Sequence, residues 1–227
     1  MGGAVMWKTR VVATCLVGAT VSAQVPVLTP PRFAAGGLPE LPVLAVGGGQ
    51  AFVELSISPA GEVTSVATLR TTPLHTEAVG AAVRRWRFKP AMRREDGLPA
   101  PKPVASKALV AAHFRPPTLI APTVGELPKD VGTPSADVPL PVATVEPPYH
   151  PQALSAGVVL IEALVNEKGQ VTAAAVLRSA PPFDEAALAA ARQWRFRPSS
   201  VAGRAVATYA YLIFGFQQPN RGLRLCC

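Results

Sequence analysis

A long segment of the sequence occurs twice. Residues 51–90 align without a gap on residues 159–198 at a constant offset of 108, and 17 of the 40 aligned pairs are identical. Unrelated segments of this composition would share roughly 3 to 4 identities, so the chain carries an internal duplication. Two copies this far apart predict two similar small domains, because the repeats of a solenoid recur more closely and more often.

Each copy begins with the pattern of a β-hairpin. In the first copy Val53, Leu55 and Ile57 alternate with polar residues, which predicts a strand that is buried on one face only. The alternation resumes after a turn at Gly61, and the second copy repeats the pattern on both sides of Gly169. We therefore expect an antiparallel hairpin in each copy, with the glycine in its turn.

A short helix is predicted after each hairpin. A proline, Pro73 or Pro181, breaks the chain, and apolar residues then recur at helical spacing as far as a tryptophan. In the Trp-Arg-Phe motif that follows, the period changes to two, so the aromatic side chains should point inward and the basic ones outward. Packing of the helix on the sheet is the favoured role of the aromatic residues, and a recognition surface is the alternative. The structural signature comprises Gly61, Trp86, Phe88 and Pro90 in the first copy, and Gly169, Trp194, Phe196 and Pro198 in the second.

A last strand is predicted near the end of each copy, over residues 104–114 and 206–216, where side chains alternate between two faces. Many of the 25 prolines of the chain lie outside the duplicated segments. Residues 24–49 are therefore expected to form a Pro/Gly-rich tether, and residues 116–146 a Pro-rich, extended linker without a fold of its own.

The N-terminal residues have the pattern of an export signal. Lys8 and Arg10 precede an apolar run over residues 11–21, and Ala23 ends a small-residue cleavage site. The apolar run is shorter than the about 20 residues that a relaxed membrane span needs. We expect residues 1–23 to be a signal peptide that is removed, which gives a periplasmic protein. An uncleaved signal that anchors the chain in the inner membrane is the alternative.

The sequence contains no motif for catalysis or metal binding. The three histidines, His75, His113 and His150, have no cysteine or carboxylate at ligand spacing. No nucleophile motif is present, and no phosphate-binding lysine follows the glycines at 47–49. We expect no enzymatic activity, no cofactor and no metal.

The charge and the cysteines leave several partners open. The formal net charge of +8 favours anionic partners, but acidic proteins and phosphate groups fit as well as nucleic acid, which we do not expect as a partner. Cys226 and Cys227 could link two chains or form a vicinal bridge, and a tail without a function is equally compatible with the sequence.

The second copy contains an ordered series of motifs: Tyr149-His150-Pro151, Gly169-Gln170-Val171, Ser179, residues 183–188, residues 194–198, Gly203 and Phe216. This series resembles the C-terminal domain of the TonB family. The first copy matches less fully, since His75-Thr76 stands where the family has Phe-Asp and Gly80 lies within the predicted helix.

This resemblance implies an α+β protein with two TonB C-terminal-like domains. Each would be a three-stranded antiparallel sheet packed by one or two helices, and the Pro-rich linker would join them. The implied boundaries are residues 50–115 for a degenerate first domain and 147–217 for the second, with a tail over 218–227.

By the same resemblance, the protein acts in TonB-dependent transport across the outer membrane, as a binding adaptor or an energy transducer. Such domains bind an extended peptide segment of an outer-membrane transporter as an added strand, because an edge strand offers unpaired N–H and C=O groups. ExbB and ExbD are implied partners if the N-terminus is retained. The candidate edge is the last strand of the second copy, with Val206, Thr208, Tyr209, Tyr211, Ile213 and Phe216, although cross-strand packing explains the tyrosines as well.

A second hypothesis is a structural envelope protein that is not energised. It would self-associate, for example as a homodimer, or bind an anionic envelope polymer. The basic residues that favour it are Arg84, Arg85, Arg87, Lys89, Arg93 and Arg94.

Overall fold

The computed structural model describes residues 28–42, 48–94, 100–115, 124–126, 131–149 and 155–217. The predicted signal peptide, Cys226 and Cys227 lie outside the described residues, as do most of residues 116–130 of the predicted linker.

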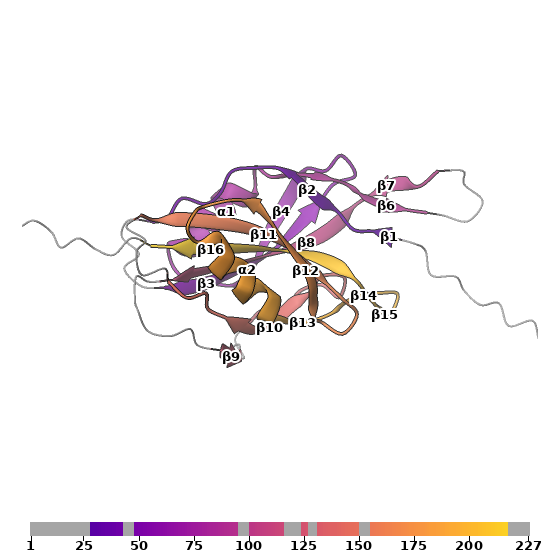
Figure 1. Ribbon diagram of the computed structural model, residues 1–227. Helices are drawn as coiled ribbons and strands as arrows, with labels where there is room; N and C mark the ends of the chain where they lie inside the picture. Colours follow the sequence, from indigo (N-terminus) through magenta and orange to yellow (C-terminus); the bar gives the residue numbers. More distant parts are fainter. Residues whose placement is uncertain are drawn as a thin grey trace, which may run out of the picture.

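Each copy contributes three long strands and one helix within the described residues. This confirms the α+β class and the order hairpin, helix, last strand that the sequence predicts. The elements are β3 (Gly49–Ile57), β4 (Val63–Arg70), α1 (His75–Val83) and β8 (Ser106–Arg115) in the first copy, and β11 (Gly157–Val165), β12 (Val171–Arg178), α2 (Asp184–Gln193) and β16 (Thr208–Phe216) in the second (Figure 1).

Short strands flank these elements and form small sheets of their own. The Trp-Arg-Phe motifs lead into β5 (Arg87–Lys89) and β13 (Arg195–Arg197), and a small hairpin follows each of them. The remaining strands are β1 (Leu28–Thr29), β2 (Arg32–Ala35), β6 (Ala91–Arg93), β7 (Lys102–Val104), β9 (Val124–Glu126), β10 (Leu140–Val145), β14 (Ser199–Val201) and β15 (Arg204–Val206).

The two copies share one six-stranded sheet in the order β12-β11-β16-β8-β3-β4. The last strands of the copies, β16 and β8, meet in the middle and run parallel, from Ala210 opposite Leu109 to Phe216 opposite Arg115. All other neighbours in this sheet are antiparallel. The expectation that residues 206–216 form a sheet edge is therefore wrong, because β16 pairs with β11 on one side and with β8 on the other.

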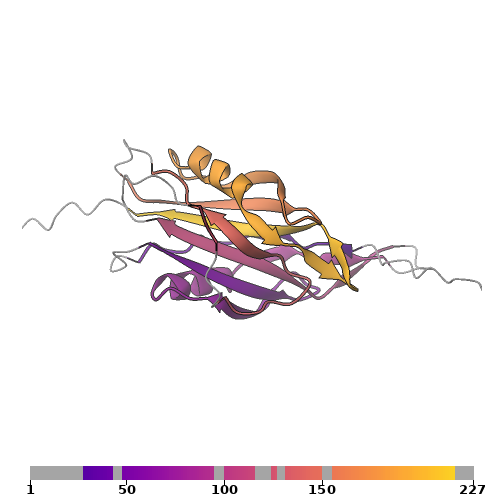
Figure 2. The ribbon, with the colours of Figure 1, turned by 90° about the horizontal axis from the view of Figure 1, so that it is seen from below.

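The parallel pairing places the two helices on opposite faces of the sheet. The strand order is reversed between the copies, β12-β11-β16 against β8-β3-β4, while β16 and β8 run in the same direction. The copies are therefore related by an approximate two-fold axis along the strands. Such an axis exchanges the two faces, so α2 covers one face and α1 the other, as Figure 2 shows.

Each face consequently has a core built from both copies. Under α2, side chains of the second copy pack with Phe52, Leu109 and Ala111 of the first. Under α1, side chains of the first copy pack with Leu160, Tyr211 and Ile213 of the second. Burial of a side chain of leucine or isoleucine size contributes about 1.5–3 kcal/mol, so these contacts hold the copies together as one folding unit.

Because both faces are covered, the central strands are buried on both sides. The prediction that the first strand of each copy is half-buried is wrong, since Glu54, on its supposed polar face, is only 7% exposed. The prediction that the aromatic signature packs inward is confirmed, because Trp86 and Trp194 are fully buried and Phe88 and Phe196 nearly so.

The segment that precedes each copy belongs to its fold. β2 pairs with β5 and β10 pairs with β13, with equivalent partners and an irregularity at the same place. The indole N–H of Trp86 donates to the carbonyl of Gly37 at 2.7 Å, and that of Trp194 donates to Val145 at 3.0 Å, again at the offset of 108. The expectation that the linker has no fold of its own is therefore wrong over Leu140–Val145, and the predicted tether contributes β2.

The turn glycines hold each hairpin against the Trp-Arg-Phe strand. Gly61 and Gly169 have φ of 82° and 74°, a left-handed conformation that favours glycine. Their carbonyls accept hydrogen bonds from the N–H of Phe88 and Phe196, both at 2.8 Å. A Cβ atom at Gly169 would lie 1.8 Å from the Phe196 carbonyl oxygen.

Replacement of Gly169 by alanine should therefore destabilise the protein strongly. The left-handed backbone and the overlap with Phe196 together should lower the free energy of unfolding by about 3 kcal/mol. Gly203 is the matched control, because its φ is 77° but nothing lies within 4 Å of its Cβ position. Gly203→Ala should cost only about 1 kcal/mol in urea unfolding, and equal costs for the two variants would contradict this account.

Candidate partner-binding site

The residues that the sequence proposes for partner binding lie together on or near β16, but inside the sheet. Tyr211, Ile213 and Phe216 are fully buried and Thr208 is 9% exposed. Val206 ends the short strand β15. Since β16 is paired on both sides from Ala210 to Phe216, no strand can be added over these residues while the two copies remain joined.

The two tyrosines of β16 instead hold the segment that leads into the first copy. Arg32 donates to both carboxylate oxygens of Glu162, at 2.8 and 2.6 Å, and to the Tyr209 hydroxyl at 3.0 Å. The Tyr211 hydroxyl accepts from the N–H of Phe33 at 2.9 Å and donates to the carbonyl of Pro31 at 3.0 Å. Burial raises the pKa of Tyr211, so the hydroxyl remains a donor at all ordinary pH values.

The equivalent carboxylate of the first copy, Glu54, is bound in a similar way on the opposite face. Lys107 donates to it at 2.7 Å, and Ser135 donates through its N–H at 2.7 Å and its hydroxyl at 2.8 Å. Burial raises the pKa of Glu54, but the hydrogen bonds from Lys107 and Ser135 outweigh this effect and hold the pKa below its usual value. Each glutamate thus fastens the leading segment of one copy to a strand of the other.

The sequence analysis did not identify Glu54 and Glu162 as equivalent residues that bind the leading segments. Glu54 and Glu162 are identical in the alignment of the copies, which was the available signal. The alternating pattern placed them on a solvent-exposed face, and only the pairing of the copies covers that face.

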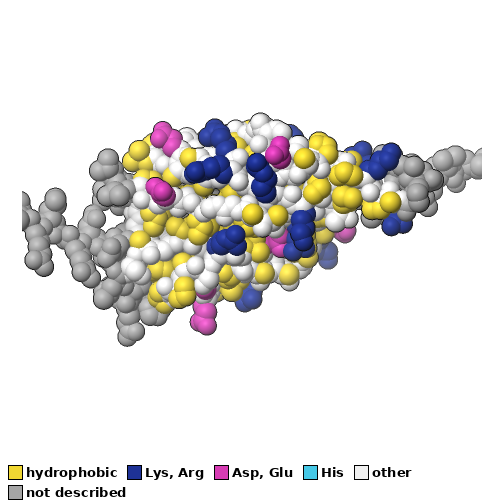
Figure 3. Space-filling model, turned by 90° about the horizontal axis from the view of Figure 1, so that it is seen from above, with side chains coloured by type: hydrophobic (Ala, Val, Ile, Leu, Met, Phe, Trp, Pro, Cys, Tyr) yellow, Lys and Arg dark blue, Asp and Glu magenta, His cyan; other side chains and the backbone are white. Residues whose placement is uncertain are grey.

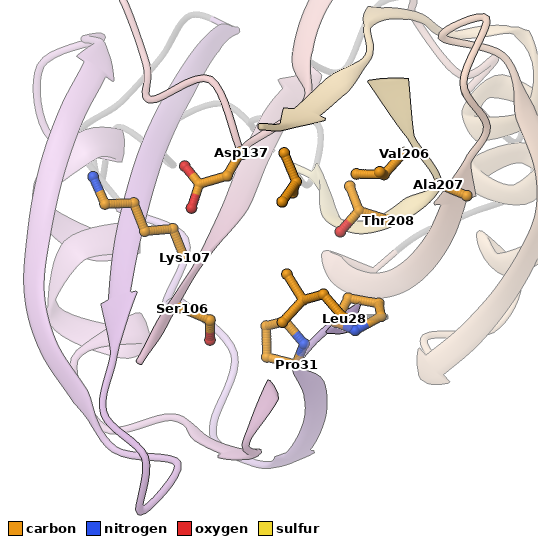
Figure 4. A pocket seen from close by; sticks show the side chains of 10 residues that line it. Leu28, Pro31, Ser106, Lys107, Asp137, Val206, Ala207 and Thr208 are labelled. Atoms are coloured by element: carbon orange, nitrogen blue, oxygen red, sulfur yellow. The ribbon is translucent and has the colours of Figure 1, made fainter. Parts of the chain in front are cut away.

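A small pocket opens where the two central strands begin. Lys107 and Asp137 lie on one side of it, and Val206 and Thr208 lie on the other (Figure 4). Its volume is about 70 Å³, whereas sites for small ligands usually measure about 300–1,000 Å³. The pocket is therefore too small for a substrate or an organic cofactor.

The free edges of the large sheet are β4 and β12. Both have irregularities in their pairing near each end, which leave a regular ladder over residues 65–68 and 173–176. The N–H of Gly132 donates to the Leu69 carbonyl at 2.7 Å and partly covers the end of β4. β12 carries no charge before Arg178, and Ala173 and Ala175 are exposed. An edge strand with small, uncharged side chains lacks the features that usually prevent pairing with another chain.

The basic residues of the alternative hypothesis lie on the surface. Arg84, Arg85, Arg87, Lys89, Arg93 and Arg94 are all exposed. Arg87 approaches Glu62 at 3.4 Å, in a solvent-exposed ion pair. On the side of the molecule that Figure 3 presents, lysine and arginine side chains are more prominent than acidic ones.

A buried histidine lies at the contact between the first copy and the end of the second. His75 is 2% exposed, and its Nε2 lies 3.3 Å from Nε2 of Gln217. Its ring lies 4.3 Å from that of Phe114, as the equivalent Phe183 lies 4.2 Å from Phe216. Burial lowers the pKa of His75, because the interior disfavours the charged imidazolium.

These features describe a class of protein: a pair of duplicated α+β domains, joined at their last strands, with two outer sheet edges. The chain matches the family of Gram-negative bacterial TonB protein C-terminal domains at residues 45–116 and 147–217, which together cover more than half of it. The chain therefore belongs to the TonB C-terminal family, in two tandem copies. A comparison with individual curated proteins gives no match.

Membership makes this a TonB-like protein of transport in the cell envelope, in a family that interacts with outer-membrane receptors. Neither helix in the described part of the chain is long and apolar enough to cross a membrane.

The contact between Arg32 and Glu162 predicts an asymmetric response to mutation. Arg32→Met leaves Glu162 buried without its cation and should cost about 2 kcal/mol in the free energy of unfolding. Glu162→Gln leaves an arginine that is 47% exposed at its side chain and can be hydrated, so it should cost about 1 kcal/mol or less. Urea denaturation of both variants and of the double variant measures the coupling. A larger cost for Glu162→Gln would contradict the arrangement.

Because His75 is buried, the stability of the folded protein should decrease in acid. Its ordinary pKa is 6.5, and burial places the folded-state pKa lower. As the pH falls below 6.5 the unfolded chain binds the proton more readily, so stability should be full above 6.5 and decline below it, by about 1.4 kcal/mol per unit of pKa difference.

His75→Phe, which copies the residue of the second domain, should remove this part of the pH dependence. Thermal unfolding of both proteins between pH 7.5 and pH 5 compares them, over about 2.5 units around the ordinary histidine pKa. Parallel pH profiles would show that His75 does not carry the effect.

Proposed function

We propose that this protein is a binding adaptor of TonB-dependent transport that recognises an extended segment of an outer-membrane transporter by strand addition at β12. The observation that supports the proposal most directly is that β12 has a neighbour on one side only, whereas β16 has one on each side. Strand addition uses unpaired main-chain groups for affinity and side-chain contacts for register.

One contact favours β12 over the other outer edge, and two further properties, which β4 shares, make β12 a suitable template. Ala173 and Ala175 are exposed and small, so a partner backbone can approach closely. Residues 173–176 form an uninterrupted ladder with β11, which gives a straight template. At β4, by contrast, Gly132 already donates to the carbonyl of Leu69.

The shared sheet makes the two copies one body, which suits an adaptor that carries a load. Both cores contain side chains of both copies, so a pull or a load on one copy is transmitted to the other through the shared sheet. Energy transduction with ExbB and ExbD is a further part of the proposal, and it requires that residues 1–23 stay attached as an anchor. Mass spectrometry of the N-terminus of the exported protein would decide between this form and a free periplasmic adaptor.

A second candidate function is binding of an anionic envelope polymer, favoured by the six exposed basic residues at positions 84–94. Such binding would weaken steeply with added salt, because exposed charges are screened beyond about 10 Å at 0.1 M ionic strength. Strand addition depends mainly on main-chain hydrogen bonds and should respond much less to salt. The proposal includes no catalytic activity, and a broad activity screen would test that part.

The proposal predicts where a bound peptide protects the backbone. A synthetic peptide from the N-terminal periplasmic region of an outer-membrane transporter should slow amide hydrogen exchange within Val171–Arg178. Exchange in residues 210–216 should not change, because this part of β16 already pairs with a strand on each side.

A matched pair of variants supplies the control. Lysine on an edge strand hinders the addition of another strand, so Ala175→Lys should weaken peptide binding by about tenfold or more. Ala67 is the equivalent exposed residue of β4, and Ala67→Lys should leave the affinity within about twofold. No protection of β12 with saturating peptide, or equal effects of the two lysines, would contradict the proposal.

A further inference from the structure

The two copies differ at one position where a strand can be present or absent. In the second copy β9 pairs with the outer edge of β10 and completes a three-stranded sheet in the order β13-β10-β9. In the first copy the equivalent sheet has only β2 and β5 within the described residues. The outer edge of β2 thus corresponds to an edge that carries a strand in the other copy.

The correspondence between the two small sheets extends to individual residues. Phe33 pairs with Phe88 and Ala35 with Arg87, as Pro141 pairs with Phe196 and Ala143 with Arg195 at the offset of 108. In the second copy the added strand pairs with residues 143–145. The equivalent residues of the first copy are therefore 35–37.

Residues 35–37 are accessible to a partner. Ala35 and Gly37 are exposed, whereas the equivalents of Gly36 and Gly37, Thr144 and Val145, are buried. Two glycines leave the backbone bare, so another chain can approach closely there. A Cβ atom on Gly36 would lie 2.2 Å from the Trp86 ring, so one face of this segment is packed directly against the core.

The charges beside this edge indicate which peptide it would take. β5, which pairs with the inner edge of β2, presents Arg87 and Lys89 to solvent one strand away from the outer edge, and α1 is followed by exposed Arg84 and Arg85. Glu62 is the only carboxylate for which an ion pair with one of these four residues is found in the described part of the chain. An added segment with acidic side chains would gain from this surplus of positive charge.

We propose that the outer edge of β2, at residues 35–37, binds an acidic, extended segment of a partner protein as an added antiparallel strand, in the position that β9 takes beside β10. This goes beyond the function proposed above, because it concerns another edge in the other copy and does not depend on β12.

The chain itself supplies the probe peptide. A capped peptide with the sequence of residues 121–128, Ala-Pro-Thr-Val-Gly-Glu-Leu-Pro, contains the strand that fills the equivalent position. Added to the full exported protein at up to about 1 mM, it should slow amide exchange in residues 33–37. A version with lysine in place of its glutamate should bind at least about tenfold more weakly, since it removes the charge complementarity.

Charge-reversed variants test the protein side. Arg87→Glu combined with Lys89→Glu should weaken the acidic peptide by about tenfold and improve binding of the lysine peptide. Arg195→Glu, at the equivalent position of the second copy, should leave both affinities unchanged, as should Ala175→Lys on β12. The last result separates this site from the one proposed for transporter segments.

Three outcomes would overturn the inference. The first is no protection of residues 33–37 at the highest peptide concentration. The second is protection only at residues 143–145, which would mean that the peptide exchanges with β9 and ignores β2. The third is a change from monomer to dimer without peptide binding, which would assign the edge to a second copy of the chain.

Discussion

The fold depends on the parallel pairing of β16 with β8. A last strand with a bare edge would leave a row of N–H and C=O groups unpaired, and each copy removes this problem for the other. Because the copies meet last strand to last strand and these strands are parallel, the helices lie on opposite faces, and each face acquires a core with side chains of both copies. The burial of Glu54 and Glu162, and their contacts with the leading segment of the opposite copy, follow from the same pairing.

The pairing also decides where a partner can bind. In one copy alone the last strand would have a free edge, but here that strand lies at the centre of the sheet. The proposed recognition therefore uses an outer edge, and the outer edges of the two copies are not equivalent. Within the described residues, β12 has no outer neighbour while β4 receives a hydrogen bond from Gly132, and β2 has no outer neighbour while β10 has β9 beside it. Duplication followed by such divergence is the basis of the two sites that we propose for strand addition.

Much of the fold within each copy could be predicted from the sequence, and the relation between the copies could not. The hairpin, the helix and the inward-facing Trp86 and Trp194 follow from local periodicity and composition. β2 and β10 escaped prediction because they share backbone pairing without sharing sequence. Prolines such as Pro141 are typical of a linker, but Pro141 is tolerated in β10 because it lies beside an irregularity and outside the residues that pair with β9. The pairing of β16 with β8 escaped prediction because hydrophobic alternation shows that a strand is buried without showing which strand lies beside it. The alternation places Tyr211 and Ile213 on the face opposite Leu212, and both a partner peptide and cross-strand packing are compatible with that pattern, so the sequence does not identify the other copy as their neighbour.

The most direct test of this account is a measurement of the contacts between β16 and β8. In the full chain, nuclear Overhauser effects should connect the backbone protons of Leu212 with those of Ala111, and amides on both sides of β16 should exchange slowly. The absence of these contacts, together with fast exchange along one side of β16 and independent tumbling of the two copies, would show that the copies do not share a sheet and would contradict the account.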